Sequence, residues 1–568
     1  MSYDDMPWVR FYDDGVEPEI RLPETTLVDR FDEVRRLYPD RPAIHFFGTT
    51  ILYETLIGHA NRFAQALIEQ GFRPGDIIAI NLPNTPQYLI AQLGALKAGC
   101  STSGLSPILT PNEMAYQLND CKAKGLVTLD ALFEHRLSDT FEKLPDLEFV
   151  IVTGILDFLP GTKRFFAGIF KKVPKGRVAP LPGKHVVRFM DILARYPDED
   201  PEVKTTPEDT CLIQYTGGTT GLPKGTVLTH GNMTANVMQI YQWIDPEMGR
   251  EVGLTGFPFF HLAGLVLGLL GVAAGGTQIL VPDPRDTKHI VKEMARYRPT
   301  MMINVPSLYI MLLEERGFKD LDFSNLEFCV SGAAPFPVTV IKELEDVIGA
   351  GKVIEVYGMT ETSPIITMNP RKGKKKIGTV GLPVPNTRIK IVDIESGTRE
   401  MPVGEEGELI MRGPQVMKEY LNRPDETAHA LREFEGERWL YTGDVARMDE
   451  DGYFTIVDRT KDMIIVGGFK VFSREVEDKL HEHYAVDSCA IIGVPNPERP
   501  GSELVELFVQ LNGACQDRKE EEIRKEIIAF ARENMSPYKV PKMIRFVDRL
   551  PQTIVGKVDK KALRNGRC

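Results

Sequence analysis

Short apolar runs alternate with segments of helical spacing along much of the chain. Residues 76–82 are apolar enough for a buried strand, and residues 87–97 then place apolar side chains at helical spacing before Gly99. The same order of strand, helix and strand returns further along, in residues 278–281, 287–297 and 301–304. Strands that alternate with helices predict α/β layers built on largely parallel sheets.

The pattern of apolar and polar residues changes near residue 380. Short apolar strands, split by Gly, Pro and Asp turns, follow one another in residues 388–392, 407–411 and 453–457. This pattern predicts a small β-rich subdomain at about 380–458. A compact α/β tail comes next, with helices at 474–481 and 519–533 and strands at 490–494 and 504–511. We therefore place a domain boundary at residues 459–462.

Length and charge narrow the class of protein. A chain of 568 residues is too long for one hydrophobic core, so we expect two to four structural units. Lys and Arg number 68 against 80 Asp and Glu, and the net charge of −12 argues against general nucleic-acid binding. The seven cysteines are scattered without a Cys-x-x-Cys pair, which predicts neither a disulfide framework nor a zinc site, and favours a reducing compartment.

Neither end of the chain carries a recognisable targeting signal. The N-terminus has acidic residues where a signal peptide needs basic ones followed by an apolar run. The final residues, Asn565-Gly-Arg-Cys568, match neither a peroxisomal nor an endoplasmic-reticulum signal. The prediction is a cytoplasmic protein.

One uncharged stretch, residues 262–281, raises the question of a membrane span. Gly275-Gly276 interrupts it, and the apolar part before them covers about 20 Å of helix. That length is too short for about 30 Å of hydrocarbon. We expect a buried helix, a glycine stop and a buried strand.

Residues 155–188 form a locally basic insertion. Eight Lys and Arg residues face a single acid, Asp157, and phenylalanines lie between them. Such a segment fits a basic amphipathic element that contacts anionic membrane, at the inner surface where an apolar substrate would enter. It also fits a solvated surface insertion, which is the interpretation we favour.

The strongest chemical signal is the segment Tyr215-Thr-Gly-Gly-Thr-Thr-Gly-Leu-Pro-Lys224, which follows an apolar strand at 211–215. Glycines let backbone N–H groups turn toward an anion, the threonine hydroxyls add donors, and Lys224 adds a cation. The composition suits a polyphosphate. It is not a P-loop, because Pro223 stands where that motif needs its second glycine. Taken alone, the segment also fits a tight turn.

Four further motifs favour the phosphate-binding interpretation of this segment over the tight turn. They are Ser331-Gly-Ala-Ala-Pro335 after a strand at 327–330, Tyr357-Gly-Met-Thr-Glu-Thr362, Tyr441-Thr-Gly-Asp444 before an expected β-hairpin, and Leu550-Pro-Gln-Thr-Ile-Val-Gly-Lys557. In this order they resemble the adenylate-forming superfamily of acyl-CoA synthetases, peptide-synthetase adenylation domains and luciferases. The resemblance covers nearly the whole chain. The opening Pro7-Trp-Val-Arg-Phe-Tyr-Asp-Asp-Gly-Val16 and Gln214-Tyr-Thr-Gly-Gly are most similar to the fatty-acyl-CoA synthetase branch, the long-chain fatty acid–CoA ligases.

The resemblance implies a fold and a reaction. It implies a large domain at 1–458, made of two α/β layered subdomains and the β-rich subdomain, a hinge at 459–462 and a small mobile α+β domain at 463–568. It implies that a carboxylic acid and MgATP give an acyl-adenylate and pyrophosphate, after which the thiol of CoA displaces AMP. The implied cofactors are ATP, Mg²⁺ and CoA, with no nucleic-acid partner and with either a monomer or a homodimer as the assembly.

By the same resemblance, each motif contributes residues to ATP binding. The β- and γ-phosphates would lie against Thr216, Gly217, Gly218, Thr219, Thr220 and Lys224. Tyr357 would stack on adenine beside Gly358, in a slot formed by Gly332, Ala333 and Ala334. Asp444 would accept hydrogen bonds from the ribose hydroxyls with help from Arg459.

The implied catalytic groups come from both domains. Glu361 resembles the Mg²⁺ ligand, Thr360 would contact the α-phosphate, and Lys557 would bridge the carboxylate and the α-phosphate. His261 resembles the residue beside the carboxylate that moves aside for the thiol, although a histidine among apolar residues is often a satisfied core residue.

The hinge and the CoA contacts are also implied. Lys461 marks the expected hinge, and rotation there would exchange Lys557 for Gly467 and Gly468. Lys470 and Ser473 stand where Asn and Pro are common, and Val558-Asp559 also departs from the family pattern, which puts details of CoA binding in doubt. In place of the usual asparagine, Lys470 would face the phosphates of CoA.

The acid itself is the least defined part. The helix after His261 would line the acyl pocket through Gly264 and Leu265, with Met359 opposite, and no aromatic gate follows His261. We favour a medium- to long-chain fatty acid, with an alicyclic or aryl acid as the alternative. Other hypotheses are an enzyme that loads a carrier protein, a luciferase-like oxygenase and a non-catalytic nucleotide-binding protein. The chain ends 11 residues after Lys557, which makes free CoA the simpler acceptor.

Overall fold

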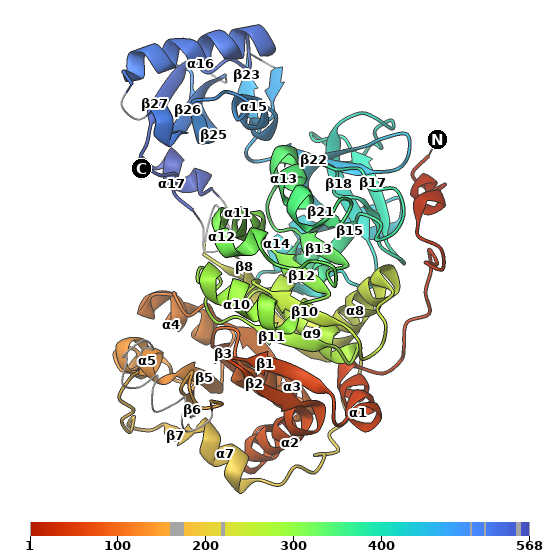
Figure 1. Ribbon diagram of the computed structural model, residues 1–568, viewed down its shortest axis with the longest axis vertical. Helices are drawn as coiled ribbons and strands as arrows, with labels where there is room; N and C mark the ends of the chain where they lie inside the picture. Colours follow the sequence, from red (N-terminus) through yellow and green to blue (C-terminus); the bar gives the residue numbers. More distant parts are fainter. Residues whose placement is uncertain are drawn as a thin grey trace.

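The computed structural model describes residues 2–159, 175–216, 222–467, 469–499, 502–515, 518–552 and 558–566. A large N-terminal domain carries a smaller C-terminal domain at one end (Figure 1). Helices and strands alternate in an α/β fold, as predicted. Over the described ranges, no helix is both long and apolar enough to cross a membrane.

One half of the large domain is built on an eight-stranded sheet. Its neighbours follow the order β19 (Glu419–Tyr420), β9 (Lys224–Thr229), β8 (Thr210–Thr216), β4 (Ser101–Gly104), β3 (Ile77–Asn81), β5 (Gly125–Leu129), β6 (Phe149–Thr153) and β7 (His185–Arg188). The strands from β8 to β7 pair in parallel. β9 pairs antiparallel with β8, and β19 pairs antiparallel with β9.

The other half is built on a nine-stranded sheet. Its order is β16 (Leu382–Pro383), β15 (Ile365–Met368), β14 (Val353–Gly358), β13 (Phe328–Ser331), β12 (Met301–Asn304), β10 (Val252–Thr255), β11 (Thr277–Leu280), β1 (Pro42–Phe46) and β2 (Thr49–Leu52). The central strands from β14 to β1 are parallel, and strands at both edges are antiparallel. The largely parallel sheets predicted from the alternation are confirmed.

Helices cover the faces of both sheets and lie between them. The main ones are α1 (Leu27–Leu37), α2 (Tyr53–Glu69), α3 (Pro86–Lys97), α4 (Pro111–Asp120), α7 (Phe189–Arg195), α8 (His230–Ile244), α9 (Leu262–Ala273), α10 (Thr287–Tyr297), α11 (Pro306–Glu314), α12 (Arg316–Lys319) and α13 (Val338–Ile348). α3 is buried along its whole length, since every one of its side chains lies in the core.

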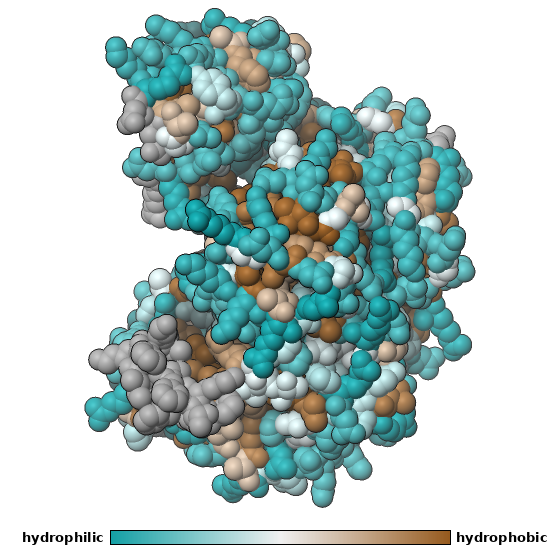
Figure 2. Space-filling view, in the orientation of Figure 1, coloured by the Kyte–Doolittle hydropathy of each residue, from teal (hydrophilic) through white to brown (hydrophobic). Residues whose placement is uncertain are grey.

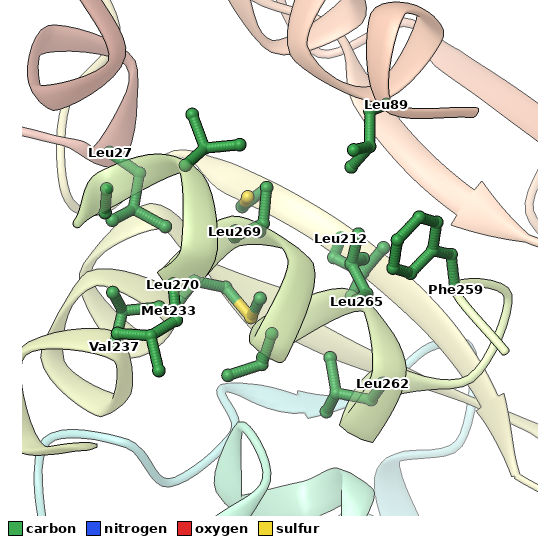
Figure 3. Packing of buried hydrophobic residues seen from close by; sticks show 14 of the residues in the cluster. Leu27, Leu89, Leu212, Met233, Val237, Phe259, Leu262, Leu265, Leu269 and Leu270 are labelled. Atoms are coloured by element: carbon green, nitrogen blue, oxygen red, sulfur yellow. The ribbon is translucent and has the colours of Figure 1, made fainter. Parts of the chain in front are cut away.

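The uncharged helix α9 is the centre of this core. Figure 3 shows Leu262, Leu265 and Leu269 of α9 packed against side chains from α1, α3, α8 and β8, including Leu89 and Leu212. Apolar neighbours on nearly every side explain why the helix carries no charge. The expected buried helix, glycine stop at Gly275 and buried strand β11 are confirmed.

The β-rich subdomain is a five-stranded antiparallel sheet. It runs β17 (Arg388–Val392), β18 (Gly407–Arg412), β21 (Glu437–Met448) and β20 (Leu431–Phe434), with β22 (Phe454–Arg459) also paired to β21. The short helix α14 (Pro424–Ala430) lies between β19 and β20 in the chain. The N-terminal segment is held beside this sheet, because Asn386, two residues before β17, exchanges two hydrogen bonds with the backbone of Ile20.

The C-terminal domain has its own core. The strands β25 (Val486–Pro495), β26 (Glu503–Leu511) and β27 (Met543–Phe546) form one sheet, and β23 (Ile464–Val466) pairs with β24 (Phe469–Val471). Three helices accompany them: α15 (Ser473–Leu480), α16 (Glu520–Asn534) and α17 (Lys560–Arg564). In Figure 1 α15 and α17 lie on the side of this domain that faces the large domain.

The surface between the two domains is partly apolar. Figure 2 shows it indented below the small domain, with apolar side chains gathered over the region of α11 and α13. Ile310 and Val338 are among the large apolar side chains exposed on those helices. Exposed apolar patches mark surfaces that contact other protein surfaces, so this face suits contact with the small domain. The hinge and the exact domain boundary at residues 459–462 stay predictions.

One motif lies in a different place from the one expected. Tyr441–Asp444 was predicted to precede a β-hairpin, but it lies inside β21, the first strand of the hairpin with β22. The glycine of this motif has a positive φ of 71°, and the β18–β21 register shifts nearby. The irregularity explains why the segment reads as a turn although it remains in the sheet.

Candidate nucleotide site

Strand ends from all three sheets of the large domain converge on one region. β13 and β14 of the nine-stranded sheet end at Ser331 and Gly358, and in the eight-stranded sheet β8 ends at Thr216 and β9 begins at Lys224. Asp444 and Arg459 come from the five-stranded sheet and face each other in its register. Ligands in open α/β sheets bind outside the carboxyl ends of the strands, so this convergence is the candidate site.

The predicted phosphate segment connects β8 to β9. Thr216 and Lys224 are register partners at the end of this antiparallel pair. Gly217, Gly218, Thr219 and Thr220 lie outside the described residues. The Lys224 ammonium is paired with the carboxylate of Glu426 on α14, and it lies 5.0 Å from the centroid of the Tyr420 ring.

Thr360 and Glu361 form a short turn directly after β14. The carboxylate of Glu361 is buried and accepts a hydrogen bond from the hydroxyl of Tyr420 at 2.5 Å. Its backbone carbonyl accepts from the N–H of Met417 at 2.8 Å. The predicted carboxylate of this motif is therefore held at both its side chain and its backbone.

Asp444 is held between two partners. The Tyr357 hydroxyl donates to its Oδ2 at 2.6 Å, and Arg459 Nε lies 3.0 Å from its Oδ1. Burial and then the charge of Asp444 raise the pKa of Tyr357 well above its usual range, so the phenol stays a donor. The same carboxylate raises the pKa of the Arg459 guanidinium. The three residues predicted around adenine and ribose thus lie in direct contact.

Two glycines allow the backbone to pass closely here. A Cβ at Gly358 would lie 1.9 Å from the Pro364 carbonyl oxygen, and one at Gly332 would lie 2.7 Å from Val356 Cγ2. Ala333 adopts a positive φ of 67°, which is uncommon for a residue with a side chain. Ala333 and Ala334 are half-buried at the end of β13, beside β14. The small-residue bend is therefore required by contact, and its placement fits the predicted adenine slot.

His261 lies just before α9, in a loop that is firmly attached. Its N–H donates to the carbonyl of Pro258 at 3.0 Å. The neighbouring Phe259 N–H donates to Asn84 Oδ1 at 2.7 Å, and the Phe259 carbonyl accepts from the Tyr88 hydroxyl at 2.8 Å. Gln214 of β8 donates to the Phe260 carbonyl at 3.1 Å, which joins the loop to the phosphate-segment strand.

The predicted acyl-pocket residues behave as packing residues here. A Cβ at Gly264 would lie 2.2 Å from the Pro258 carbonyl oxygen, and Leu265 is fully buried in the core of Figure 3. Met359 is half-buried. Two surface cavities of about 580 and 570 Å³ lie elsewhere and are lined by none of these residues. The acyl pocket therefore stays a prediction.

The remaining predicted groups belong to the hinge and the C-terminal domain. Lys461, Gly467 and Lys470 are exposed, and Lys470 Nζ lies 3.9 Å from Glu395 of the large domain. Gly468 and Lys557 lie outside the described residues. Their predicted roles at the hinge, with CoA and in catalysis remain predictions.

Sequence reasoning missed three residues of this region. Tyr420 and Glu426 contact Glu361 and Lys224, and Asn84 holds the His261 loop. Asn84 belongs to a turn between β3 and α3, and Tyr420 to an edge strand of two residues. Neither position carries a local pattern that distinguishes it, because the partners are distant in sequence.

Known proteins match the chain over almost its full length. The profile of the AMP-binding enzyme family matches residues 31–421, and that of its C-terminal domain matches residues 475–557. The chain belongs to the AMP-binding enzyme family. This confirms the resemblance to adenylate-forming enzymes inferred from the motifs.

Individual relatives of this AMP-binding enzyme fall into two groups. A long-chain-fatty-acid–CoA ligase of Bacillus subtilis (strain 168) is 37% identical over 98% of this chain and 97% of its own. A feruloyl-CoA synthase of Amycolatopsis sp is 32% identical over 93% and 96%.

Among solved structures, an anthranilate CoA ligase in complex with anthranoyl-AMP has a TM-score of 0.82 at 25% identity, covering 100% of this chain and 99% of that one. The ATP-bound MatB of Rhodopseudomonas palustris has a TM-score of 0.78 at 27% identity, covering 95% and 98%. The predicted fold is therefore confirmed.

Proposed function

We propose that this protein is an ATP-dependent acyl-CoA synthetase. The carboxylate oxygen of an acid attacks the α-phosphorus of ATP, the bond to pyrophosphate breaks, and an acyl-adenylate remains. The thiol sulfur of CoA then attacks the acyl carbon, loses its proton and expels AMP. The relatives described as CoA ligases at 37% and 32% identity support this activity.

The observation that carries the proposal is the contact of Tyr357 and Arg459 with Asp444. A buried carboxylate that two side chains fix in place is preorganised to accept hydrogen bonds from a ribose. It lies beside the ends of β13 and β14, where Gly332 and Gly358 let backbone segments pack closely against each other. Preorganised partners reduce the entropy lost when the nucleotide binds.

Thr216, Lys224 and Glu361 would contact the polyphosphate of ATP and its metal ion. Thr216 and Lys224 are register partners at the facing ends of β8 and β9, where a hydroxyl and an ammonium would meet the phosphates. Two anions, the acid and the α-phosphate, must come together, so a cation that neutralises their repulsion lowers the barrier. By resemblance Lys557 supplies that cation, and this role remains a prediction.

Mg²⁺ fits the chemistry of Glu361. The carboxylate is a hard oxygen ligand, and Tyr420 is bonded to one of its two oxygens. The described part of the chain has no cluster of three or more His, Cys, Asp and Glu side chains suited to a metal. Mg²⁺ commonly takes one or two carboxylates together with substrate phosphates, so a single protein carboxylate suffices. When bound, the ion would neutralise phosphate charge.

The two groups of relatives support two different classes of acid substrate. The long-chain-fatty-acid–CoA ligases reach the higher identity over almost the whole chain, and they support a medium- to long-chain fatty acid. The feruloyl-CoA synthase and the anthranilate CoA ligase support an aryl acid as the second candidate. A cytoplasmic location remains part of the proposal, with residues 155–188 as a solvated surface insertion and peripheral membrane contact as the alternative; residues 160–174 of that insertion lie outside the described part.

A panel of acids separates these candidates. AMP release is measured with fatty acids of increasing length, with benzoate and hydroxycinnamate derivatives, and with CoA present or omitted. We expect CoA-dependent AMP release with fatty acids and weaker release with aryl acids. Release that needs no acid would overturn acyl activation, and release that needs acid but not CoA would favour another acceptor.

A further inference from the structure

Tyr420 occupies a fixed place beside β9 and Lys224. It ends β19, the edge strand that pairs with β9, and its register partner is Thr226. The N–H of Tyr420 donates to Thr427 Oγ1 of α14 at 2.9 Å, and the next N–H, of Leu421, donates to the Gly225 carbonyl at 2.7 Å. Hydrogen bonds to α14 and β9 hold the backbone of Tyr420, and its side chain is buried.

The hydroxyl of Tyr420 holds the candidate metal ligand. It donates to Oε1 of Glu361 at 2.5 Å, and both side chains are at least nine-tenths buried. Among the described residues, no other side chain hydrogen-bonds this carboxylate, whose Oε2 remains for a ligand.

The ring of Tyr420 contacts the candidate phosphate cation. Lys224 Nζ lies 5.0 Å from the ring centroid, within the range of a cation–π interaction. One side chain therefore contacts both the ammonium of β9 and the carboxylate after β14, which belong to different sheets. Moving Tyr420 would change the distance between these two groups.

We propose that Tyr420 is a positioning residue that sets Glu361 and Lys224 at the spacing one MgATP polyphosphate requires. The hydroxyl orients the carboxylate toward the metal, and the ring supports the ammonium toward the phosphates. This role rests on the proposed function, because it assigns the polyphosphate to this region. Tyr420 itself has no contact with the reacting atoms in this role.

Tyr420→Phe separates the two contacts, because it removes the hydroxyl and keeps the ring. Binding of a non-hydrolysable ATP analogue, with a methylene between the α- and β-phosphates, is measured by calorimetry in Mg²⁺ and in EDTA. We expect about a tenfold loss of affinity in Mg²⁺ and less than a twofold loss in EDTA. The matched control is Tyr53→Phe, which removes a buried hydroxyl bonded at 2.6 Å to the Gly276 carbonyl, away from the site.

Tyr420→Leu removes both contacts and is expected to weaken binding in Mg²⁺ and in EDTA alike. Unchanged affinity of Tyr420→Phe in Mg²⁺, or an equal loss with and without the metal, would overturn the positioning role. Thermal unfolding of each variant shows whether it is folded. A folded Tyr420→Phe variant whose affinity for the analogue depends on Mg²⁺ as in the wild type also contradicts the positioning role. If the wild-type protein binds no MgATP analogue, the proposed function itself fails.

Discussion

The phenolic oxygen of Tyr357 lies 2.6 Å from Oδ2 of Asp444, although 87 positions separate the two residues. Tyr357 is on the nine-stranded sheet and Asp444 on the five-stranded sheet. Arg459 completes the contact on the other carboxylate oxygen. The nucleotide region is therefore a junction between sheets and does not belong to one motif.

Asp444→Ala is expected to raise the Michaelis constant for ATP at least tenfold. Losing hydrogen bonds to a charged group costs about 1.5–3 kcal/mol, and the variant also leaves Arg459 without its carboxylate. Initial rates at varied ATP, with saturating acid and CoA, check this. Glu433→Ala, an exposed carboxylate on β20 of the same sheet, is the control and should leave the constant unchanged. A wild-type constant in Asp444→Ala would place ribose binding elsewhere.

Glu426→Gln is expected to lower the Michaelis constant for ATP. In the ligand-free protein Glu426 pairs with Lys224, so a polyphosphate that binds Lys224 must compete with this carboxylate. A partly exposed ion pair contributes about 0.5–1 kcal/mol, which corresponds to a change of about two- to fivefold.

The matched control is Asp425→Asn, which removes one charge from the exposed neighbouring position of α14. It should change the constant by less than Glu426→Gln, because Glu426 alone of the two is ion-paired to Lys224. An equal effect of both variants would mean that only the net charge of the helix matters. A higher constant in Glu426→Gln would show that the pair supports binding.

Glu355→Gln is expected to stabilise the protein at alkaline pH. Burial raises the pKa of the Glu355 carboxyl to about 7, against the backbone N–H of Gly378 and the charge of Arg474, which lower it. The folded state therefore holds the proton more tightly than the unfolded state. Wild-type stability should fall as pH rises from about 4.5 to about 7, and the loss is complete above that range.

Thermal unfolding of wild type and Glu355→Gln at pH 5 and pH 8 tests the sign. The two proteins should unfold at similar temperatures at pH 5, and the variant should unfold at a higher temperature at pH 8. Glutamine retains an oxygen that can accept from Gly378, whose N–H lies 2.8 Å from Oε2. A stability difference that does not depend on pH would contradict the assignment to Glu355.

Lys560→Met is expected to destabilise the small domain. Lys560 Nζ lies 2.7 Å from Glu477 Oε1 and also bonds to Ser473, which in turn bonds to Asp458. Removing the ammonium leaves the mostly buried Glu477 carboxylate without its cation, at a cost of about 3 kcal/mol, the lower end for a buried ion pair. Urea unfolding of the wild type and the variant measures this loss.

The destabilisation by Lys560→Met should shrink as the pH falls. Burial raises the pKa of Glu477 and the charge of Lys560 lowers it, so without Lys560 the carboxyl takes up a proton more readily. Lys561→Met, on the same helix, is the control and should change stability less. Loss of stability that is equal at pH 5 and pH 8 would contradict the role of the Glu477 charge.

The same cluster explains one departure from the family pattern. Ser473, where proline is common, donates its N–H and its hydroxyl to the Asp458 carboxylate. Proline has neither donor. The sequence revealed the departure, but its partner Asp458 lies 15 positions away, and only the folded chain shows that the serine is hydrogen-bonded there.

Local patterns were sufficient for most elements. Helix α10 and strands β12 and β17 begin and end at the predicted residues, because each is a short periodic run between Gly, Pro or polar breaks. Tyr441–Asp444 was misplaced because a positive-φ glycine inside a strand resembles a turn. The motif residues Tyr357, Glu361, Asp444 and Lys224 were all named from the sequence, and all lie in the region where the sheets meet.

The sequence by itself determined the order of strands and helices, the buried helix α9 and the chemical types present in each motif. These follow from hydrophobic periodicity and from side-chain chemistry, which act over a few residues. Only the tertiary structure decided which groups contact each other: Tyr420 with Glu361, Glu426 with Lys224, and Ser473 with Asp458. Such pairs depend on how strands from separate sheets are placed side by side, and side-chain contacts between distant segments leave no periodic trace in the chain.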